Sequence, residues 1–351
     1  MINATWKQRL IRHAHISRSH HIPMRVRWDF PKNVLGRKLM LRQTMIPNMD
    51  WLKKIKGEVY YDEPMALYTS IRVGGPADIF IVPKGLEELK TIFQNVGDVP
   101  VFVLGEGTNL LVRDKGIRGI VVSLKDAFPA AKKISICEKP DDTERVLVRA
   151  GAGVKMSYLA KHTSRQGLWG LEGLVGVPGS LGGTLVMNAG AEGVEIGPSV
   201  RSVSRVTSRG ELQRLNRNEM EFQYRKTVFP PGGGVIVEAE LELQKGRAVE
   251  IQEVVDRNLR KRNLSQPLNI PNSGSIFKNP INDKAGRLIE AAGLKGFSVG
   301  GASISVKHAN FILNKGDASA KDVLSVIDHV LKKVKEKMGV ELETEIVVVG
   351  E

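Results

Sequence analysis

The stretch GLEGLVGVPGSLGGTLVMNAGAEG, residues 170–193, lies in the most glycine-rich part of the chain. Residues 167–197 hold ten of the 36 glycines, and six of these ten recur at intervals of three residues. The interval breaks at Gly183 and the triplets hold only one proline, which excludes a collagen-like helix. Residues 177–183 are instead typical of a helix entrance with an early proline and with Ser180 as its cap. We expect free backbone N–H groups there to face an anion.

A second glycine-rich segment, LGEGTNLL at residues 104–111, directly follows the apolar run VFVL. A strand that enters G-x-G-T-N brings several backbone N–H groups into one concavity that can bind phosphate. The segment lacks the third glycine of the dinucleotide fingerprint and the Lys-Ser/Thr of a P-loop. Taken alone, it fits a tight structural turn better than a ligand site. Two such segments together favour a ligand with a long phosphate-bearing body, such as a dinucleotide cofactor.

The rest of the chain alternates predicted strands and helices, which indicates an α+β protein. The expected strands are residues 77–82, 101–104, 119–124, 145–149, 201–207, 212–215, 235–243 and 345–349, with 201–207 and 212–215 forming a hairpin. The expected helices are residues 86–96, 154–166, 247–262 and 319–338. The last of these carries one apolar stripe, typical of core packing, and a capping box of Ser319 and Asp322.

The formal net charge of +14 is concentrated at one end of the chain. Residues 1–56 contain 13 Lys and Arg but only two acidic residues, whereas the remaining residues contain 39 basic and 36 acidic side chains. A nucleic-acid-binding role for the whole protein is therefore disfavoured. Three interpretations of the leader stay open: a disordered basic arm that contacts RNA or membrane, an organelle transit peptide, and a translation start at Met40 or Met49. Its histidines (His13, His15, His20 and His21) lack the spacing and the acidic or cysteine partners of a metal site.

Cysteine and apolar content exclude several further classes of protein. The single cysteine, Cys137, excludes an internal disulfide and a multi-cysteine zinc site, and it fits a reducing compartment. No apolar stretch approaches the roughly 18 residues of a membrane helix, and the leader lacks the apolar block of a secretory signal. We therefore expect a cytoplasmic protein that is not inserted into a membrane and holds no metal.

Six blocks, in order along residues 57–351, resemble the UDP-N-acetylenolpyruvoylglucosamine reductase family. They are RVGGPAD (72–78), LGEGTNLLV (104–112), the stretch 170–193, QYR (223–225), GSIFKNP (274–280) and LETEI (342–346). The order of the last blocks is similar to the shorter, second subtype of the family. The resemblance implies a two-part FAD-binding domain of the p-cresol methylhydroxylase type followed by a smaller C-terminal α/β substrate domain. In this sequence the expected parts are the leader 1–56, the FAD-binding subdomains 57–124 (joined by strand 345–351) and 125–262, and the substrate domain 263–344.

The resemblance also implies a reaction and its cofactors. NADPH would reduce FAD, and the flavin hydride would then pass to the enolpyruvyl group of UDP-N-acetylglucosamine enolpyruvate, giving UDP-N-acetylmuramate in peptidoglycan precursor synthesis. Ser275 would be the proton donor, with Arg225 and Glu345 as its partners, and the substrate-binding residues would be Tyr224, Lys278 and Asn279. The expected FAD-binding residues are Arg72, Gly105, Glu106, Gly107, Thr108, Asn109, Val177, Pro178, Gly179, Ser180, Gly182, Gly183, Asn188, Ala189 and Gly190.

The chemistry of the three expected catalytic residues suits this reaction. Hydride addition drives negative charge into the substrate carboxylate, which the permanent charge of Arg225 stabilises in a dry site. Glu345 can orient or donate a hydrogen bond if burial raises its pKa. A free hydroxyl is a poor acid, so Ser275 needs a neighbour such as Lys278 or a relay water. Without the resemblance, these residues fit a surface cation, a solvated carboxylate and a turn hydroxyl.

The sequence departs from the family pattern at two positions near the expected site, and two alternative functions remain to be considered. Thr108 replaces a frequent serine but keeps the hydroxyl, whereas Glu192 replaces a frequent aromatic residue near the expected flavin or substrate. We interpret His162, His308 and His329 as structural, and Arg260 and Arg262 as candidates for reaching the substrate diphosphate. The rivals are another flavin oxidase or dehydrogenase of the same fold, and nucleic-acid binding through the basic leader.

Overall fold

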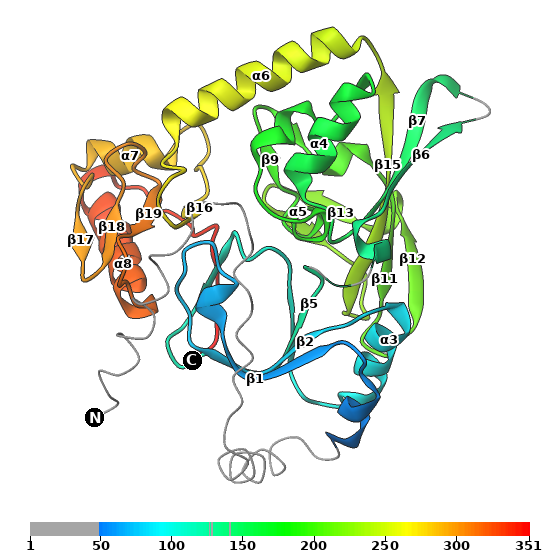
Figure 1. Ribbon diagram of the computed structural model, residues 1–351. Coiled ribbons are helices and arrows are strands. Elements are labelled where there is room, and N and C mark those ends of the chain that lie inside the picture. Colours follow the sequence, from blue (N-terminus) through cyan, green and yellow to red (C-terminus); the bar gives the residue numbers. More distant parts are fainter. Residues whose placement is uncertain (1–48, 126, 128, 140–141) are drawn as a thin grey trace, which may run out of the picture. The chain divides into compact units, whose positions relative to one another are not determined.

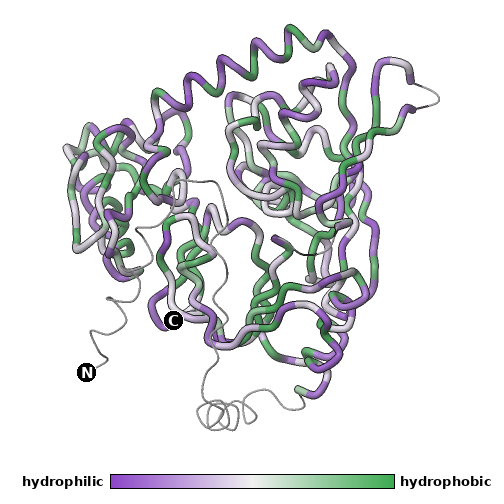
Figure 2. Tube along the Cα trace, viewed as in Figure 1, coloured by the Kyte–Doolittle hydropathy of each residue, from purple (hydrophilic) through white to green (hydrophobic). Residues whose placement is uncertain are grey.

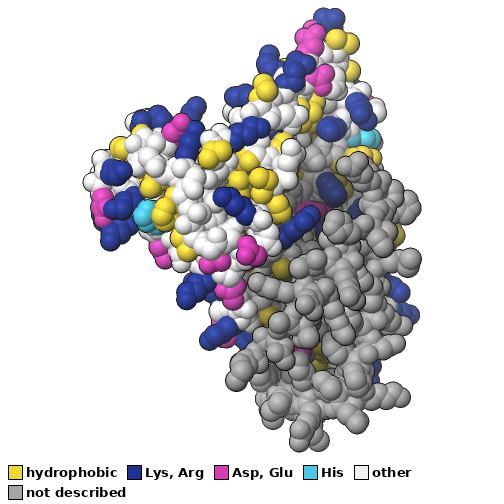
Figure 3. All heavy atoms as spheres, turned by 60° about the vertical axis from the view of Figure 1, so that its left-hand side comes forward, with side chains coloured by type: hydrophobic (Ala, Val, Ile, Leu, Met, Phe, Trp, Pro, Cys, Tyr) yellow, Lys and Arg dark blue, Asp and Glu magenta, His cyan; other side chains and the backbone are white. Residues whose placement is uncertain are grey.

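The computed structural model describes residues 49–351 except 126, 128 and 140–141 (Figure 1). The predictions for residues 1–48, which include the four leader histidines and a start at Met40, lie outside the described residues. No described helix combines the length and the apolar character that a membrane crossing requires. On the face shown in Figure 3, Lys and Arg side chains are interspersed with Asp, Glu and hydrophobic side chains.

The fold begins before residue 57, where the sequence places the end of the leader. The 3-10 helix η1 (Met49–Lys54) contains the buried residues Trp51 and Leu52, and Ile55 after it is also buried. The backbone N–H groups of Lys56 and Gly57 donate to the Glu88 carboxylate of helix α3 at 3.0 and 3.1 Å. The expected boundary is therefore wrong for residues 49–56, because three apolar side chains bury this short segment despite its lysines.

The first sheet has the strand order β1-β2-β5-β3, and the glycine-rich segment 104–111 begins at its edge. Strands β2 (Pro76–Val82), β5 (Ile117–Ser123) and β3 (Val101–Leu104) are parallel, and β1 (Glu58–Pro64) is antiparallel to β2. Helix α3 (Leu86–Asn95) follows β2. A separate parallel pair joins β4 (Leu110–Val112) to the last strand, β20 (Val347–Val349), so the end of the chain returns to the glycine-rich segment.

The second sheet is antiparallel, with the strand order β12-β11-β15-β7-β6. Its strands are β6 (Ile134–Lys139), β7 (Asp142–Gly151), β11 (Val200–Val206), β12 (Leu212–Asn216) and β15 (Val235–Lys245), with β8 (Leu168–Trp169) paired to the end of β15. The predicted hairpin is confirmed, since Val206 pairs with Leu212. Between β7 and β11 lie α4 (Met156–Arg165), η4 (Glu172–Gly176), α5 (Leu181–Val186), β9 (Gly190–Ala191) and β10 (Val194–Glu195). The small hairpin of β13 (Glu221–Gln223) and β14 (Lys226–Val228) follows β12.

Helix α6 (Ala248–Ser265) connects β15 to the last sheet and is hydrophilic along most of its length (Figure 2), with only Ile251 and Val255 buried. That sheet has the order β16-β19-β18-β17, made of β16 (Asn272–Ser275), β17 (Ser298–Val299), β18 (Ala302–Ile304) and β19 (Phe311–Asn314). Helices α7 (Ala285–Ala291) and α8 (Ala320–Met338) pack a common core with it. The predicted apolar stripe of α8 is confirmed as core, and Ser319 and Asp322 form the predicted capping box.

Two elements are shorter than predicted because backbone bonds to neighbouring segments end them. Helix α4 starts at Met156, since Lys155 forms a bridge with Ser180. Strand β20 starts only at Val347, since the N–H of Glu345 instead donates to the carbonyl of Ile276 at 2.8 Å. That single bond places Glu345 beside the strand that ends at Ser275.

Candidate active site

A cavity of about 860 Å³ brings together the glycine-rich segments and the expected catalytic residues. This volume lies within the range of about 300–1,000 Å³ that is typical of small-molecule sites. Seventeen of the 21 predicted site residues line the cavity. The four that do not are Arg72, Asn188, Tyr224 and Lys278.

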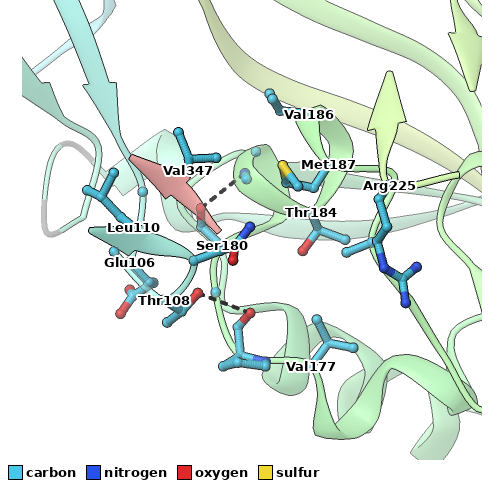
Figure 4. A pocket seen from close by; sticks show the side chains of 18 of the residues that line it. Glu106, Thr108, Leu110, Val177, Ser180, Thr184, Val186, Met187, Arg225 and Val347 are labelled. Carbon is cyan, nitrogen blue, oxygen red and sulfur yellow. Dashed lines mark hydrogen bonds between the residues drawn. The ribbon is translucent and has the colours of Figure 1, made fainter. Parts of the chain in front are cut away.

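The two glycine-rich segments face each other across a narrow separation (Figure 4). The Thr108 hydroxyl donates to the carbonyl of Pro178 at 3.4 Å. A Cβ on Gly105 would lie 2.7 Å from Ser180 Oγ, and one on Gly179 would lie 3.0 Å from Thr108 Oγ1. The absence of side chains at these glycines therefore lets the two segments approach, with hydroxyl groups between them.

Backbone N–H groups at these segments lack protein acceptors. Among the described residues, none accepts a hydrogen bond from the N–H groups of residues 105–109, 179 and 180, and all of these residues line the cavity. Such a set of donors fits the diphosphate of a dinucleotide, so the residues present suit the expected FAD.

The donors lie before helix α5 and not within its first turn. Ser180 caps the helix as predicted, accepting from the N–H of Gly183 at 3.4 Å. The N–H groups of Leu181 and Gly182, however, donate to the carbonyls of Val154 and Ala152 at 2.8 and 2.9 Å. The prediction that the helix entrance offers free N–H groups is therefore wrong for α5 itself, because the neighbouring segment 152–154 satisfies them.

Arg225, Glu345 and Ser275 line the same cavity although they come from three separate segments. Arg225 occupies the two-residue turn between β13 and β14 with a φ of 57°. This left-handed conformation is uncommon for a non-glycine residue. Its Nε lies 3.1 Å from Glu345 Oε1, and its Nη2 donates to the carbonyl of Gly190 at 3.0 Å. The guanidinium is thereby fixed between the glycine-rich segment and the C-terminal residues.

The environment of Glu345 shifts the pKa of its carboxyl upwards. Burial raises the pKa of the Glu345 carboxyl above its usual value, and this effect outweighs the opposing attraction of Arg225. Its backbone is held on both sides, because its carbonyl accepts from Asn109 Nδ2 at 3.0 Å and its N–H donates to Ile276. The condition that the sequence analysis set for Glu345, a raised pKa through burial, is met.

Asn188 does not line the cavity but supports the turn that carries Arg225. The side chain is buried, and its Nδ2 donates at 2.9 Å both to Glu195 Oε2 and to the carbonyl of Gln223, the residue before Tyr224. Its Oδ1 accepts from the N–H of Gly197 at 3.1 Å. All these bonds are to protein, so they position the wall of the cavity and the hairpin of Arg225.

The other three predicted residues outside the lining lie near its edge or away from it. Tyr224 is exposed, its ring lies 4.8 Å from the Arg225 guanidinium carbon, and its hydroxyl accepts from the N–H of Asn279 at 3.4 Å. Lys278 pairs with Glu343. Arg72 has a φ of 57° and is exposed. Of the substrate-binding set, only Asn279 therefore lines the cavity.

Sequence reasoning missed several polar residues of the lining, among them Arg205 and Ser273. Arg205 is buried and donates to Gln213 Oε1 and to the carbonyls of Pro230 and Pro231, at 3.0, 2.9 and 2.7 Å. It thereby holds the cavity wall formed by the segment FPPGGG, residues 229–234. Ser273 is buried, and its hydroxyl has no hydrogen-bond partner in the part of the chain that the structure describes. The run of glycines after two prolines was the only sequence feature that could have predicted this part of the cavity wall. No motif near Arg205 in the sequence predicted that its side chain would hold the wall.

Glu192 and the three body histidines do not line the cavity. Glu192 forms an ion pair with Lys261 of α6 at 2.6 Å, which explains how a carboxylate is accommodated where an aromatic residue is frequent. His329 stacks on Phe297 with ring centres 3.9 Å apart, and His308 contacts Phe311 edge to face. Within residues 49–351, apart from the gaps, no group of three His, Cys, Asp or Glu lies close enough together to hold a metal ion.

This geometry, with opposed glycine-rich segments around a cavity at the edge of a parallel sheet, defines an FAD-binding protein. Residues 77–216 match the model of an FAD binding domain. Residues 266–349 match the model of the C-terminal domain of UDP-N-acetylenolpyruvoylglucosamine reductase. The chain belongs to the UDP-N-acetylenolpyruvoylglucosamine reductase family. The predicted fold class, an FAD-binding domain of the p-cresol methylhydroxylase type with a smaller C-terminal domain, is confirmed.

The match to individual relatives extends over nearly the whole length of each relative. The reductase of Lachnoclostridium phytofermentans is 42% identical over 292 residues, covering 83% of this chain and 92% of the relative. That of Anoxybacillus flavithermus is 43% identical over 297 residues, covering 84% and 95%. The crystal structure of the Thermus caldophilus reductase superposes with a TM-score of 0.70 at 35% identity, covering 84% of this chain and all of that one.

Proposed function

We propose that this chain is an NADPH-dependent FAD oxidoreductase that reduces the enolpyruvyl group of UDP-N-acetylglucosamine enolpyruvate to UDP-N-acetylmuramate. The reaction belongs to peptidoglycan precursor synthesis, and through it to cell wall biogenesis, cell shape and division. The observation that carries the proposal is the meeting of Arg225, Glu345 and Ser275 on a cavity whose other wall offers diphosphate-binding amides.

Each of the three residues has a distinct task in this proposal. When bound, FAD supplies hydride transfer to the methylene carbon of the enolpyruvyl group. Arg225 is permanently charged and stabilises the negative charge that develops on the substrate carboxylate. Ser275 gives its hydroxyl proton to the adjacent carbon, so that the double bond becomes a lactyl ether, and the serine regains a proton from water.

Glu345 holds the proton-donating arrangement in place. Its carboxyl is half-buried and burial raises its pKa, so at a given pH a larger fraction is neutral than for a free carboxyl, and the neutral form is able to donate a hydrogen bond. Lys278 is less suited to assist Ser275, since it pairs with Glu343 and does not line the cavity. We therefore propose that Glu345, or a water held by it, assists Ser275.

The remaining assignments belong to the same proposal. FAD would occupy the cavity along residues 105–109 and 177–190, with the FAD-binding subdomains at 57–124 and 125–262 and the substrate domain at 263–344. The partners are the UDP-sugar enolpyruvyl ether and NADPH, and we place the reaction in the cytoplasm, where nucleotide sugars and NADPH are made. No observation favours nucleic-acid binding through the leader or an oxygen-using oxidase.

The half-reactions of Ser275→Ala test the proposal. Because this change removes the proposed proton donor only, reduction by NADPH should persist, whereas reoxidation by the enolpyruvyl substrate should slow by about 10²- to 10⁴-fold. Ser298→Ala is the matched control, since Ser298 is an exposed strand serine of the same sheet outside the cavity. Normal rates of both half-reactions in Ser275→Ala would show that Ser275 is not the acid.

A further inference from the structure

Arg205, Arg225 and Arg262 line the cavity, and Arg262 has no side-chain partner among the described residues. Arg205 donates to three acceptors, and Arg225 to Glu345 and Gly190. For Arg262, no described residue supplies a hydrogen-bond acceptor or a carboxylate within ion-pair distance, although its side chain lines the cavity. A partly desolvated cation without a counter-charge is costly unless an anion occupies the space beside it.

The position of Arg262 is determined by the backbone that it covers. Arg262 lies in the last turn of α6, and its side chain crosses Gly176, the last residue of η4. A Cβ on Gly176 would lie 2.8 Å from Arg262 Cδ and 2.9 Å from its Nη1. Glycine at this position thus allows the guanidinium to lie against the backbone next to the segment 177–183, and the burial lowers the pKa of Arg262 without removing its charge at neutral pH.

A purely structural role explains less of this arrangement. A basic residue in the last turn of a helix interacts favourably with the helix dipole, and Arg262 fulfils that condition. Arg260, two residues earlier on the same helix, is exposed and does not line the cavity. The dipole accounts neither for the glycine beneath Arg262 nor for its place in the cavity wall.

Space for a nucleotide continues beyond Arg262. Gln266, one turn further along the chain, lines both the main cavity and a neighbouring one of about 400 Å³. Asn263 and Lys307 line the neighbouring cavity, and Lys307 Nζ donates to the carbonyl of Asn263 at 2.7 Å, which brings a second cation to the end of α6. A ligand with its phosphates at Arg262 therefore has room for an attached nucleoside past Gln266.

We propose that Arg262 binds the diphosphate of the nucleotide reactant that enters the cavity beside FAD. This inference rests on the proposed function, in which two reactants carry a diphosphate, the UDP-sugar and NADPH. The diphosphate of FAD itself already has the amides of residues 105–109, 179 and 180. The guanidinium supplies planar N–H donors that match phosphate oxygens.

The test uses purified FAD-containing enzyme with Arg262→Gln and Arg262→Lys, and Arg260→Gln as the control on the same helix. Dissociation constants for UDP and for uridine are measured by titration calorimetry. For Arg262→Gln we expect the constant for UDP to rise about 10- to 100-fold while that for uridine is unchanged. Arg262→Lys should retain part of the affinity, and Arg260→Gln should bind UDP like the wild type.

Half-reaction kinetics then distinguish the two sources of the diphosphate. If Arg262 serves the UDP-sugar, KM rises for that substrate with little change in kcat, and the KM for NADPH is unchanged; an increase for NADPH instead assigns the residue to the reductant. Unchanged KM for both reactants, or a change confined to FAD affinity, would overturn the proposal. A wild-type enzyme that fails to reduce the UDP-sugar would instead refute the proposed function, so the two failures are distinguishable.

Discussion

Arg225 Nε lies 3.1 Å from Glu345 Oε1, and this contact joins the hairpin of β13 and β14 to the segment before β20. Both residues line the cavity, and Glu345 is in turn held next to β16 by the bond from its N–H to Ile276. The pair therefore links the wall beside Gly190 to the strand that carries Ser275. Several predictions depend on this link and on the glycine-rich wall opposite.

Replacing Arg225 with lysine should distinguish the contribution of its positive charge to the reaction from that of its two-nitrogen contact geometry. Arg225 reaches Glu345 and the carbonyl of Gly190 with two different nitrogens, and a single ammonium group cannot reproduce that fork. We expect Arg225→Lys to fold and to bind FAD, but to carry out the second half-reaction at least about tenfold more slowly. Stopped-flow absorbance with the enolpyruvyl substrate measures this. Lys226→Arg is the control, since Lys226 is exposed and adjacent; wild-type rates in Arg225→Lys would show that the fork is not required.

The half-buried carboxyl of Glu345 should make stability depend on pH. Burial raises its pKa in the folded state above the ordinary value of 4.5, so its stabilising contribution is complete below about pH 4.5 and is lost as the pH rises through the folded pKa. Glu345→Gln cannot titrate. The free energy of unfolding of the wild type relative to Glu345→Gln should therefore fall as the pH rises above about 4.5, as measured by denaturant titration. A difference that is constant with pH would mean that the carboxyl is not perturbed.

The close approach of Gly107 to residue 68 should make it intolerant of a side chain. Its φ is +63°, and a Cβ would lie 1.9 Å from the carbonyl oxygen of Tyr68. We expect Gly107→Ala to lower the free energy of unfolding by about 2 kcal/mol or more and to weaken FAD binding, because the backbone must shift. Gly85→Ala is the control, since a Cβ there meets no atom within 4 Å; as Gly85 is the N-cap of α3, a cost below about 1 kcal/mol is expected. Equal behaviour of the two variants would contradict the account.

Arg205 should act as a positioning residue for the wall formed by residues 229–234. Arg205→Met leaves Gln213 Oε1 and two proline carbonyls without their donors, so we expect a loss of about 1–3 kcal/mol in unfolding free energy. FAD affinity should fall too, because the released segment lines the cavity. Arg201→Gln on the same strand is exposed and should change stability by less than about 0.5 kcal/mol. Unaltered FAD affinity in a folded Arg205→Met protein would show that the wall is held by other contacts.

Local patterns predicted the secondary structure well where a single segment decides it. The stripe and capping box of α8, the hairpin of β11 and β12, and β2 are found as expected. The boundary at residue 57 failed because charge dominated the interpretation of residues 49–56, whereas three apolar side chains determine their burial. The length of β20 and the start of α4 failed because distant backbone groups, which no local pattern reveals, compete for their hydrogen bonds.

The sequence predicted the site residues that belong to the quoted motifs. It did not predict the residues whose roles depend on tertiary contacts. Residues 105–109 and 177–183 line the cavity as their glycines suggested, yet the free amides lie before α5 because residues 152–154 reach its first turn. The supports, Arg205 and Asn188, have partners seven or more residues away in sequence, so no spacing rule could identify their roles. The sequence made Arg262 a candidate for the substrate diphosphate, but only the fold shows that its side chain covers Gly176 and lines the cavity.

A two-stage anaerobic stopped-flow experiment on the wild-type protein tests the central claim most directly. NADPH is mixed first with the FAD-containing enzyme, and UDP-N-acetylglucosamine enolpyruvate is added in the second stage. The account predicts that flavin absorbance bleaches with NADPH and returns on addition of the enolpyruvyl substrate, with one UDP-N-acetylmuramate formed per flavin reoxidised. Reduced flavin that ignores this substrate and is reoxidised rapidly by oxygen alone would contradict it.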